Sequence, residues 1–477
     1  MIFKTMIPPL PFKKSRRDGI LLTGGFNRRN ETRHATSLQS PAGTAYYTCH
    51  ICRPFGTWAL FLAFFVRRLK PILLYIFLVS CTGNTSLIDN NISDIIDLTV
   101  GLNNIQTVRL SEIADSVSFI PFETNPQSVM GQALRNIEFT PQHIFYFNKY
   151  FDWSGKYLGA IGRQGKGPYE EPEGVFNVIY KDNYFYSKGS KFIEYDIIGK
   201  PTGKIRNLYS AREFGDNDFL RSADSFITVG EYFVVYDTPI TLYYLNDNFE
   251  TVQSRVVFQT DIPPARTFHQ GIGNSKYITY YKDNILFYNF INDTIFYLTD
   301  SGLKPQWIVN FDDPLRLPAE VIMNSTKLTN DLMKSLIRKS STVENSDLVR
   351  LTDGKLKVGA VYETDSYLFF FISKIFYYAT SRGKQPASYI VIFNKNTGNL
   401  KKVERGFIDD LLGMGFFFPK VGIYDEKMIS FIWPFELFDY IEDYKERGRE
   451  VNPQLVALSK KVKADDNPIL ILVHLKK

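Results

Sequence analysis

The stretch Tyr389-Ile-Val-Ile-Phe-Asn-Lys-Asn-Thr-Gly398 contains the pattern that decides the fold. A short run of β-branched and aromatic residues is followed by a turn that begins with Asn and closes on Gly. The same pattern recurs at Phe192–Gly199 and at Thr294–Gly302. Such runs are typical of β-strands, and the Asn or Asp side chain caps a turn in which Gly adopts a positive φ. Each copy therefore predicts a β-hairpin.

The turns recur at regular intervals. With Asn246 counted as a member without glycine, they begin at residues 152, 196, 246, 300 and 394, which are 44, 50, 54 and 94 residues apart. The long last gap has apolar residues at helical spacing, which predicts a helical insertion over residues 315–347. Strand-rich repeats of about 40–50 residues indicate a β-propeller. We therefore expect an all-β fold, a six-bladed propeller over residues 101–477 with this small insertion.

Composition and charge agree with a β-rich protein that does not bind nucleic acid. The chain of 477 residues has 40 Phe, 29 Tyr and 4 Trp, and aromatic residues favour strands. Residues 1–80 carry 12 Lys and Arg against two acids, whereas the remaining 397 residues carry 44 against 48. The positive excess is thus confined to the N-terminal segment, and no basic surface for a phosphate backbone is predicted.

The N-terminal segment has the features of a lipoprotein leader. A basic flank at residues 67–70 precedes the apolar run Pro71–Ser80, which ends at Cys81 and is too short to span a bilayer. The motif Leu78-Val-Ser-Cys81 resembles the bacterial lipobox, which implies a lipidated Cys81. The alternatives are a buried strand or a plain signal sequence with a chance cysteine. No cysteine follows Cys81, so the mature protein needs no disulfide.

These features divide the chain into four parts. Residues 1–80 are a leader, in which residues 1–65 are expected to be an over-extended reading frame and residues 66–80 the signal peptide. Residues 81–100, polar and short, are expected to be a flexible tether. No Asp stands directly after Cys81 and no acidic run follows it, so the segment resembles neither an inner-membrane retention signal nor a surface-export signal. We expect an outer-membrane lipoprotein facing the periplasm. The pair Cys49 and Cys52 lacks a second pair to complete a zinc site.

A longer motif carries a family resemblance. The sequence Phe151-Asp-Trp-Ser-Gly-Lys-Tyr-Leu-Gly-Ala-Ile-Gly-Arg-Gln-Gly-Lys-Gly-Pro-Tyr-Glu170 resembles a signature of NHL-like six-bladed β-propeller lipoproteins of Bacteroidota. Segments at 120–123, 416–419 and 467–476 fall in the matching order, so the resemblance covers roughly residues 100–477. The segment between His143 and Asp152 is short for two strands, which predicts a truncated first blade.

The glycine-rich part of this signature has two possible interpretations, a structural crossover and a phosphate-binding loop. Its candidate site residues are Gly162, Gly165, Gly167, Pro168 and Glu170. Glycines and Pro168 suit a tight crossover between blades, whereas a phosphate cradle requires a helix N-terminus and is disfavoured by the acids that follow. The crossover is the favoured reading, although Glu170 could also accept a ligand hydroxyl or a cation.

Catalytic motifs are scarce. After Cys81 the histidines are His143, His269 and His474, and no Gly-x-Ser-x-Gly elbow is present, so no catalytic residue and no metal ligand is predicted. The adjacent acids at 312–313 and 409–410 are expected to point apart on their strands. No cofactor is expected, but a Ca²⁺ or Mg²⁺ ion at the ring centre stays open because its ligands need no linear motif.

Two functional classes remain. The family resemblance implies a lipid-anchored binding module for a peptide, a glycan or a partner protein, linked to polysaccharide uptake or sensing. The alternative is a metal-dependent enzyme of the six-bladed lactonase or lyase type. Three or four acidic or Asn side chains converging on the axis would favour the enzyme, whereas an axis lined with Tyr, Trp and Arg would favour binding.

Overall fold

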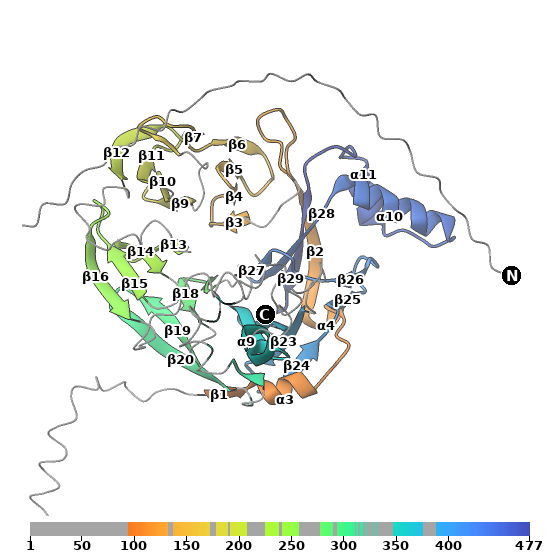
Figure 1. Cartoon of the computed structure of the whole chain (residues 1–477). Coiled ribbons are helices and arrows are strands. Elements are labelled where there is room, and N and C mark those ends of the chain that lie inside the picture. The colour runs from red at the N-terminus through yellow and green to blue at the C-terminus, as the bar shows by residue number, and fades with distance from the viewer. Residues whose placement is uncertain are drawn as a thin grey trace, which may run out of the picture. The chain divides into compact units, whose positions relative to one another are not determined.

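The computed structural model describes residues 94–131, 137–171, 178–188, 191–207, 225–237, 241–256, 277–289, 293–310, 347–374 and 388–477, with a few single positions between 312 and 331. The expected leader and Cys81 lie outside these residues. The described strands form six sheets of four or five strands arranged in a ring around a central axis (Figure 1). The chain is a six-bladed β-propeller, as the repeat spacing predicts.

The first three blades follow one another along the chain. Blade 1 contains β3 (Ile137–Phe139), β4 (Ile144–Tyr146), β5 (Lys149–Phe151) and β6 (Tyr157–Ala160). Blade 2 contains β9 (Val178–Lys181), β10 (Tyr184–Lys188), β11 (Lys191–Tyr195) and β12 (Pro201–Asn207). Blade 3 contains β13 (Ser225–Val229), β14 (Tyr232–Asp237), β15 (Thr241–Leu245) and β16 (Thr251–Val256).

Of the last three blades, blades 4 and 6 each include a strand from the N-terminal part of the described chain. Blade 4 contains β17 (Ile278–Tyr281), β18 (Asn284–Phe287), β19 (Thr294–Thr299) and β20 (Gly302–Asn310), with β1 (Asp94–Asp97) parallel to β20 at its outer edge. Blade 5 contains β21 (Leu356–Glu363), β22 (Tyr367–Lys374), β23 (Ser388–Asn394) and β24 (Leu400–Val403). Blade 6 contains β27 (Gly422–Tyr424), β28 (Lys427–Ile432), β29 (Ile469–Leu475) and β2 (Ala114–Pro121).

Blade 6 closes the ring by joining the two ends of the propeller. Its outermost strand β2 comes from the N-terminal side and pairs with the C-terminal strand β29, with Phe119 opposite Ile471. The apolar run at the C-terminus is buried, and Ile469 and Val473 have no exposed surface. A strand covered on both faces is expected to be apolar throughout. The C-terminal run is therefore an internal strand of the closing blade.

The repeated turns occupy equivalent places in blades 1 to 5, where each joins the third strand to the fourth. In blade 2, Asp196 Oδ1 accepts hydrogen bonds from the backbone N–H groups of Ile198 (3.1 Å) and Lys200 (2.8 Å). Gly199 has a φ of +79°, and a Cβ there would collide with the carbonyl of Ala160 in blade 1. The turn therefore needs glycine both for its backbone angle and for the close approach of two blades.

The turn in blade 3 has phenylalanine, and not glycine, at the position with positive φ. Phe249 adopts a φ of +60° and is 1% exposed, with its ring stacked on Phe192 at a centroid distance of 4.8 Å. Burial of this ring between blades 2 and 3 stabilises a backbone angle that is unfavourable for a residue other than glycine. Asn246 caps the turn as Asp196 does in blade 2.

Two expectations from the sequence need correction. Blade 1 is complete, because β4 and β5 are only three residues long and a tight turn through Phe147, at a φ of +54°, joins them. The expected tether over residues 81–100 is ordered from Asp94 onward. There β1 and helix α3 (Leu98–Asn103) lie along the outside of blades 4 and 5, and Asn104 Nδ2 donates to the carbonyl of Leu400 (2.7 Å).

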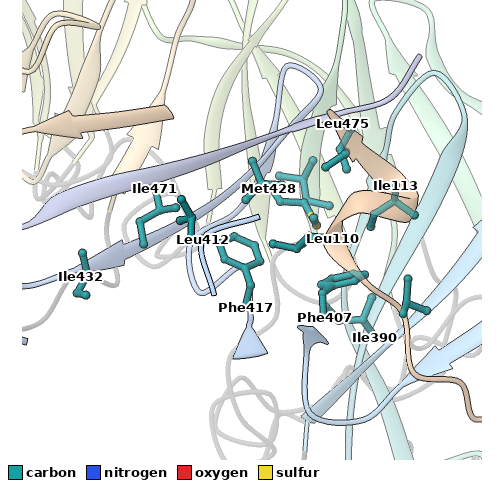
Figure 2. Packing of buried hydrophobic residues seen from close by; sticks show 14 of the residues in the cluster. Leu110, Ile113, Ile390, Phe407, Leu412, Phe417, Met428, Ile432, Ile471 and Leu475 are labelled. Carbon is teal, nitrogen blue, oxygen red and sulfur yellow. The ribbon is translucent and has the colours of Figure 1, made fainter. Parts of the chain in front are cut away.

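Helices and short strands fill the space beside blades 5 and 6. Helix α4 (Leu110–Ile113) and the pair β25 (Phe407–Asp409) and β26 (Gly415–Phe417) connect to the blades, and α10 (Pro434–Glu446) and α11 (Pro453–Ser459) are inserted between β28 and β29. Figure 2 shows Leu110, Ile113, Phe407 and Met428 within one buried cluster. Helices α10 and α11 lie outside the expected repeat pattern.

The antiparallel blades give the ring two different faces. The turns that join strand one to strand two in every blade, and strand three to strand four in blades 1 to 5, lie on one face, called here the short-turn face. The other ends of the strands point towards the opposite face. The expected helical insertion falls between β20 and β21 in the chain. Few of its positions are described, of which Val321, Leu328 and Asp331 are helical, and helix α9 (Asp347–Thr352) follows it.

Candidate functional site

A channel along the ring axis forms a large cavity in the described part of the chain. It has a volume of about 1280 Å³ and is lined by residues from the innermost strands of all six blades, β3, β9, β13, β17, β21 and β27. This volume exceeds the roughly 300–1,000 Å³ of pockets that hold drug-sized ligands. The channel is therefore large enough for an extended ligand.

Near the short-turn face, the channel wall is formed by residues at the same position in the innermost strand of each blade. The penultimate residue of every innermost strand lines the channel. These residues are Glu138, Tyr180, Thr228, Tyr280, Tyr362 and Ile423. Side chains alternate along a strand, so the same distance from the short turn places the same side of each strand towards the axis. Three of the six are tyrosines and one is an acid.

Three further aromatic rings gather at the junction of blades 1 and 6. Phe139, Trp153 and Tyr424 have centroid distances of 5.7, 5.5 and 5.9 Å, with interplanar angles of 23°, 30° and 16°. All three line the channel and are half-buried. Trp153 Nε1 donates a hydrogen bond to the carbonyl of Thr140 (3.1 Å), which holds the indole in place. We call these three near-parallel rings the aromatic platform.

The polar groups beside the platform are phenols and a carboxylate. Burial raises the pKa of Tyr280, and the nearby Glu138 carboxylate and Tyr424 phenol raise it further. The Tyr280 side chain is nevertheless 36% exposed, because solvent reaches it through the channel while protein surrounds it. Burial, together with Asp425, raises the pKa of Tyr424 to about 12. Both phenols therefore stay neutral at physiological pH and can donate or accept hydrogen bonds.

The lysines at the channel mouth are paired with acids. Lys427 Nζ lies 2.5 Å from Asp425 Oδ2, and Lys282 Nζ lies 2.6 Å from Asp365 Oδ1. Tyr281 also donates to Asp365 (2.8 Å), which ties blade 4 to blade 5. These pairs neutralise both cations, so the mouth has no concentrated positive charge.

The axis does not match the donor set of a divalent cation. The channel-lining carboxylates are Glu138, Asp283 and Asp425, and Asp425 is engaged by Lys427. Among the described residues, no group of three or more His, Cys, Asp or Glu side chains could hold a metal ion. Ca²⁺ takes six to eight oxygen ligands. The described carboxylates alone therefore do not supply the ligand set of the central metal that the enzyme alternative requires.

The signature loop connects blade 1 to blade 2. Glu170 Oε2 accepts a hydrogen bond from the Gly167 N–H (2.9 Å). Lys191 Nζ donates to the carbonyl oxygens of Gly167 (2.9 Å), Pro168 (2.9 Å) and Glu170 (3.0 Å). The loop thus folds around its own carboxylate and a lysine of β11.

The other two glycines of the signature are close to neighbouring side chains. A Cβ on Gly162, which has a φ of +63°, would lie 2.6 Å from the Tyr195 hydroxyl. A Cβ on Gly165 would collide with the Glu170 carboxylate. Short strands β7 (Arg163–Gln164) and β8 (Glu170–Glu171) pair in parallel across the loop. A strand, and not a helix N-terminus, therefore follows directly after the loop.

The remaining predicted residues do not assemble into a site. Asp409 Oδ1 accepts from the Leu412 N–H (2.8 Å), whereas Asp410 Oδ2 accepts from the Ser111 hydroxyl (2.5 Å), so these adjacent acids have different partners. Of the other pair, Asp312 is described and Asp313 is not. Cys81, Cys49, Cys52 and His269 lie outside the described residues.

The two described histidines have separate surroundings. His143 is 9% exposed, lies against Tyr180 and Phe185, and its Nδ1 has no hydrogen-bond partner in the described part of the chain. Burial lowers the pKa of His143, although Asp152 partly opposes this. His474 Nε2 lies 2.7 Å from the Ser118 hydroxyl in blade 6. Neither histidine lines the channel.

The sequence analysis missed most of the channel wall. Trp153 was inside the quoted signature, but Phe139, Tyr280 and Tyr424 were not singled out. For Tyr280 the available signal was the position two residues before the first turn of its blade, whereas Phe139 and Tyr424 are the last residues of their strands and lie outside that pattern. Using it requires the first strand of every blade to be located, and several of these strands are short.

Comparisons with known proteins support the fold. A family model described as "Domain of unknown function (DUF4934)" matches residues 93–474. The crystal structure of a Bacteroides fragilis protein whose export is inferred is similar at 16% identity and a TM-score of 0.53, over 80% of this chain and 100% of the other. No curated protein matches the sequence.

More distant likenesses include two other solved structures. BamB from Moraxella catarrhalis is 12% identical with a TM-score of 0.27, over 61% of this chain and 78% of its own. A streptogramin B lyase is 11% identical with a TM-score of 0.29, over 60% and 87%.

Proposed function

The chain belongs to the family of the domain of unknown function DUF4934, and since that description assigns no activity, we propose from the channel geometry that the propeller is a ligand-binding module. One observation carries the proposal. The channel wall near the short-turn face is dominated by aromatic side chains, and the described residues there contain no cluster of metal-ligating groups. Aromatic and phenolic walls with few charged groups are typical of binding sites.

The location proposed for this module is the periplasmic side of the outer membrane, with Cys81 as the lipid anchor. The leader pattern supports this proposal. None of the helices in the described residues is long and apolar enough to cross a membrane. The strap formed by β1 and α3 begins at Asp94, so about a dozen residues after Cys81 would form the tether, with a coil-like reach of roughly 20 Å. The propeller would then lie close to the membrane, where it could serve an uptake or sensing complex.

A steric block of the channel tests the binding proposal. Thr228 is half-buried, lines the channel and belongs to the penultimate ring, so Thr228→Trp fills space at the axis. A thermal-shift screen of glycans, peptides and divalent cations should find a compound that stabilises the wild type. A ligand at a free concentration of 100 times its Kd raises the free energy of unfolding by about 2.7 kcal/mol. The stabilisation should disappear in Thr228→Trp.

The matched control is Thr251→Trp, which adds the same bulk to an exposed position on the outer strand β16. It should retain the full ligand-induced shift. A compound that stabilises Thr228→Trp as strongly as the wild type would show that binding occurs outside the channel. Stabilisation by Ca²⁺ or Mg²⁺ alone, with turnover of a lactone substrate, would favour the enzyme instead.

A further inference from the structure

The channel next to the short-turn face contains a specific combination of surfaces. We propose that it binds a neutral oligosaccharide, with one sugar ring stacked on the aromatic platform of Phe139, Trp153 and Tyr424. This inference rests on the proposed binding function and adds the chemical class of the ligand. It depends on the orientation of the rings, the free hydroxyl groups and the charge of the wall.

Ring orientation decides between a flat ligand and a cation. The three rings of the platform are near-parallel, with interplanar angles of 16–30°. A cage for a quaternary ammonium group surrounds the cation with several ring faces. Near-parallel, stacked rings instead turn their flat apolar faces in one direction, and one face of a pyranose ring is a matching flat array of C–H groups. The geometry therefore suits stacking of a sugar.

The hydroxyl groups beside the platform supply the polar contacts a sugar needs. In the described part of the chain, the phenols of Tyr280 and Tyr424 have no hydrogen-bond partner. Both stay neutral because their pKa values are raised. Glu138 and Asp283 add carboxylates to the wall, and a carboxylate accepts hydrogen bonds from sugar hydroxyls. Donors and acceptors thus lie around an apolar platform.

The charge of the wall disfavours an anionic ligand. Lys282 and Lys427, the two channel-lining lysines, are both in ion pairs, which leaves no free cation to hold a phosphate or an acidic sugar. Polyanions are bound by clusters of Arg and Lys, which this wall lacks among its described residues. A volume of about 1280 Å³ accommodates several sugar rings.

Titration of the purified protein with defined oligosaccharides tests the assignment. The probes are cello-, malto-, xylo- and mannohexaose, with tetragalacturonate and a tyrosine-rich and a lysine-rich peptide as comparators. Ligand-observed NMR and tryptophan fluorescence report binding. We expect at least one neutral hexasaccharide to bind with a Kd of about 1 mM or tighter. Trp153→Ala should weaken that binding at least tenfold, and Tyr280→Phe, which removes one hydroxyl, about threefold to tenfold.

Trp307→Phe is the control, because Trp307 lies on the outer strand β20 and does not line the channel. It should leave sugar affinity unchanged. Failure of all four neutral hexasaccharides at about 5 mM, or binding that Trp153→Ala leaves intact, would overturn the sugar assignment. If a peptide or the acidic sugar alone binds, and Thr228→Trp abolishes it, the binding function stands while the neutral sugar is wrong. If Thr228→Trp changes no binding at all, the binding function itself fails.

Discussion

Replacement of Lys191 by Met tests whether the glycine-rich signature is a structural crossover. The ammonium of Lys191 donates three hydrogen bonds of 2.9, 2.9 and 3.0 Å to carbonyl oxygens of the loop. Hydrogen bonds to a charged group contribute about 1.5–3 kcal/mol each. Pro168 is exposed, so water can replace some of these hydrogen bonds in the variant. We therefore expect the free energy of unfolding to fall by about 2–4 kcal/mol. Methionine keeps most of the length and the apolar stem of the side chain. The loss of stability therefore measures the contribution of the ammonium group.

Thermal unfolding of the purified protein measures this loss. With about 2.1 cal/mol/K of unfolding entropy per residue and about 380 residues in the propeller, 2–4 kcal/mol lowers Tm by roughly 3–5 °C. Lys166→Met is the matched control, because Lys166 is exposed in the same loop. It should leave Tm unchanged within about 1 °C. Equal Tm values for the two variants would refute the structural reading of the loop.

Four further predictions concern anchoring, closure, pH and orientation. Cys81→Ala should move the protein from the membrane fraction to the soluble fraction on ultracentrifugation, because the diacylated cysteine is the expected anchor; unchanged fractionation would exclude lipidation at this residue. Deletion of residues 466–477 removes β29 and with it the partner of β2, so the product should be insoluble or rapidly cleaved in limited proteolysis, and a soluble deletion with an unchanged Tm would place ring closure elsewhere. Burial lowers the pKa of His143 in the folded protein below its ordinary value of about 6.5, so the unfolded state binds the proton first and stability should fall as pH drops below about 6.5; His143→Phe should flatten this part of the Tm–pH curve, and an unaltered slope would contradict the assignment. Protease added to intact cells should leave the propeller uncut until the outer membrane is permeabilised, whereas digestion on whole cells would indicate surface display.

Local sequence patterns determined the architecture. The Asp or Asn turns at residues 152, 196, 246, 300 and 394 depend on contacts within five residues, so their positions, the strands before them and the blade period could all be predicted. The C-terminal strand was recognisable because a continuous apolar run suits a fully covered strand. Helix α10 also carries local signals, Pro434 at its first position and a capping Glu436, which the search for repeats passed over.

Contacts between distant residues were decided only by the tertiary structure. Nothing near Phe139, Trp153 or Tyr424 in the sequence marks them as neighbours, because Trp153 and Tyr424 come from blades 1 and 6, which meet only when β2 pairs with β29 and the ring closes. The same holds for Tyr280 of blade 4, whose pKa is raised in part by the Glu138 carboxylate of blade 1. The three-residue strands of blade 1 and the outer strap from Asp94 likewise depend on neighbouring blades for stability. Local patterns therefore specify blades, whereas the channel exists only through the packing of six blades around one axis.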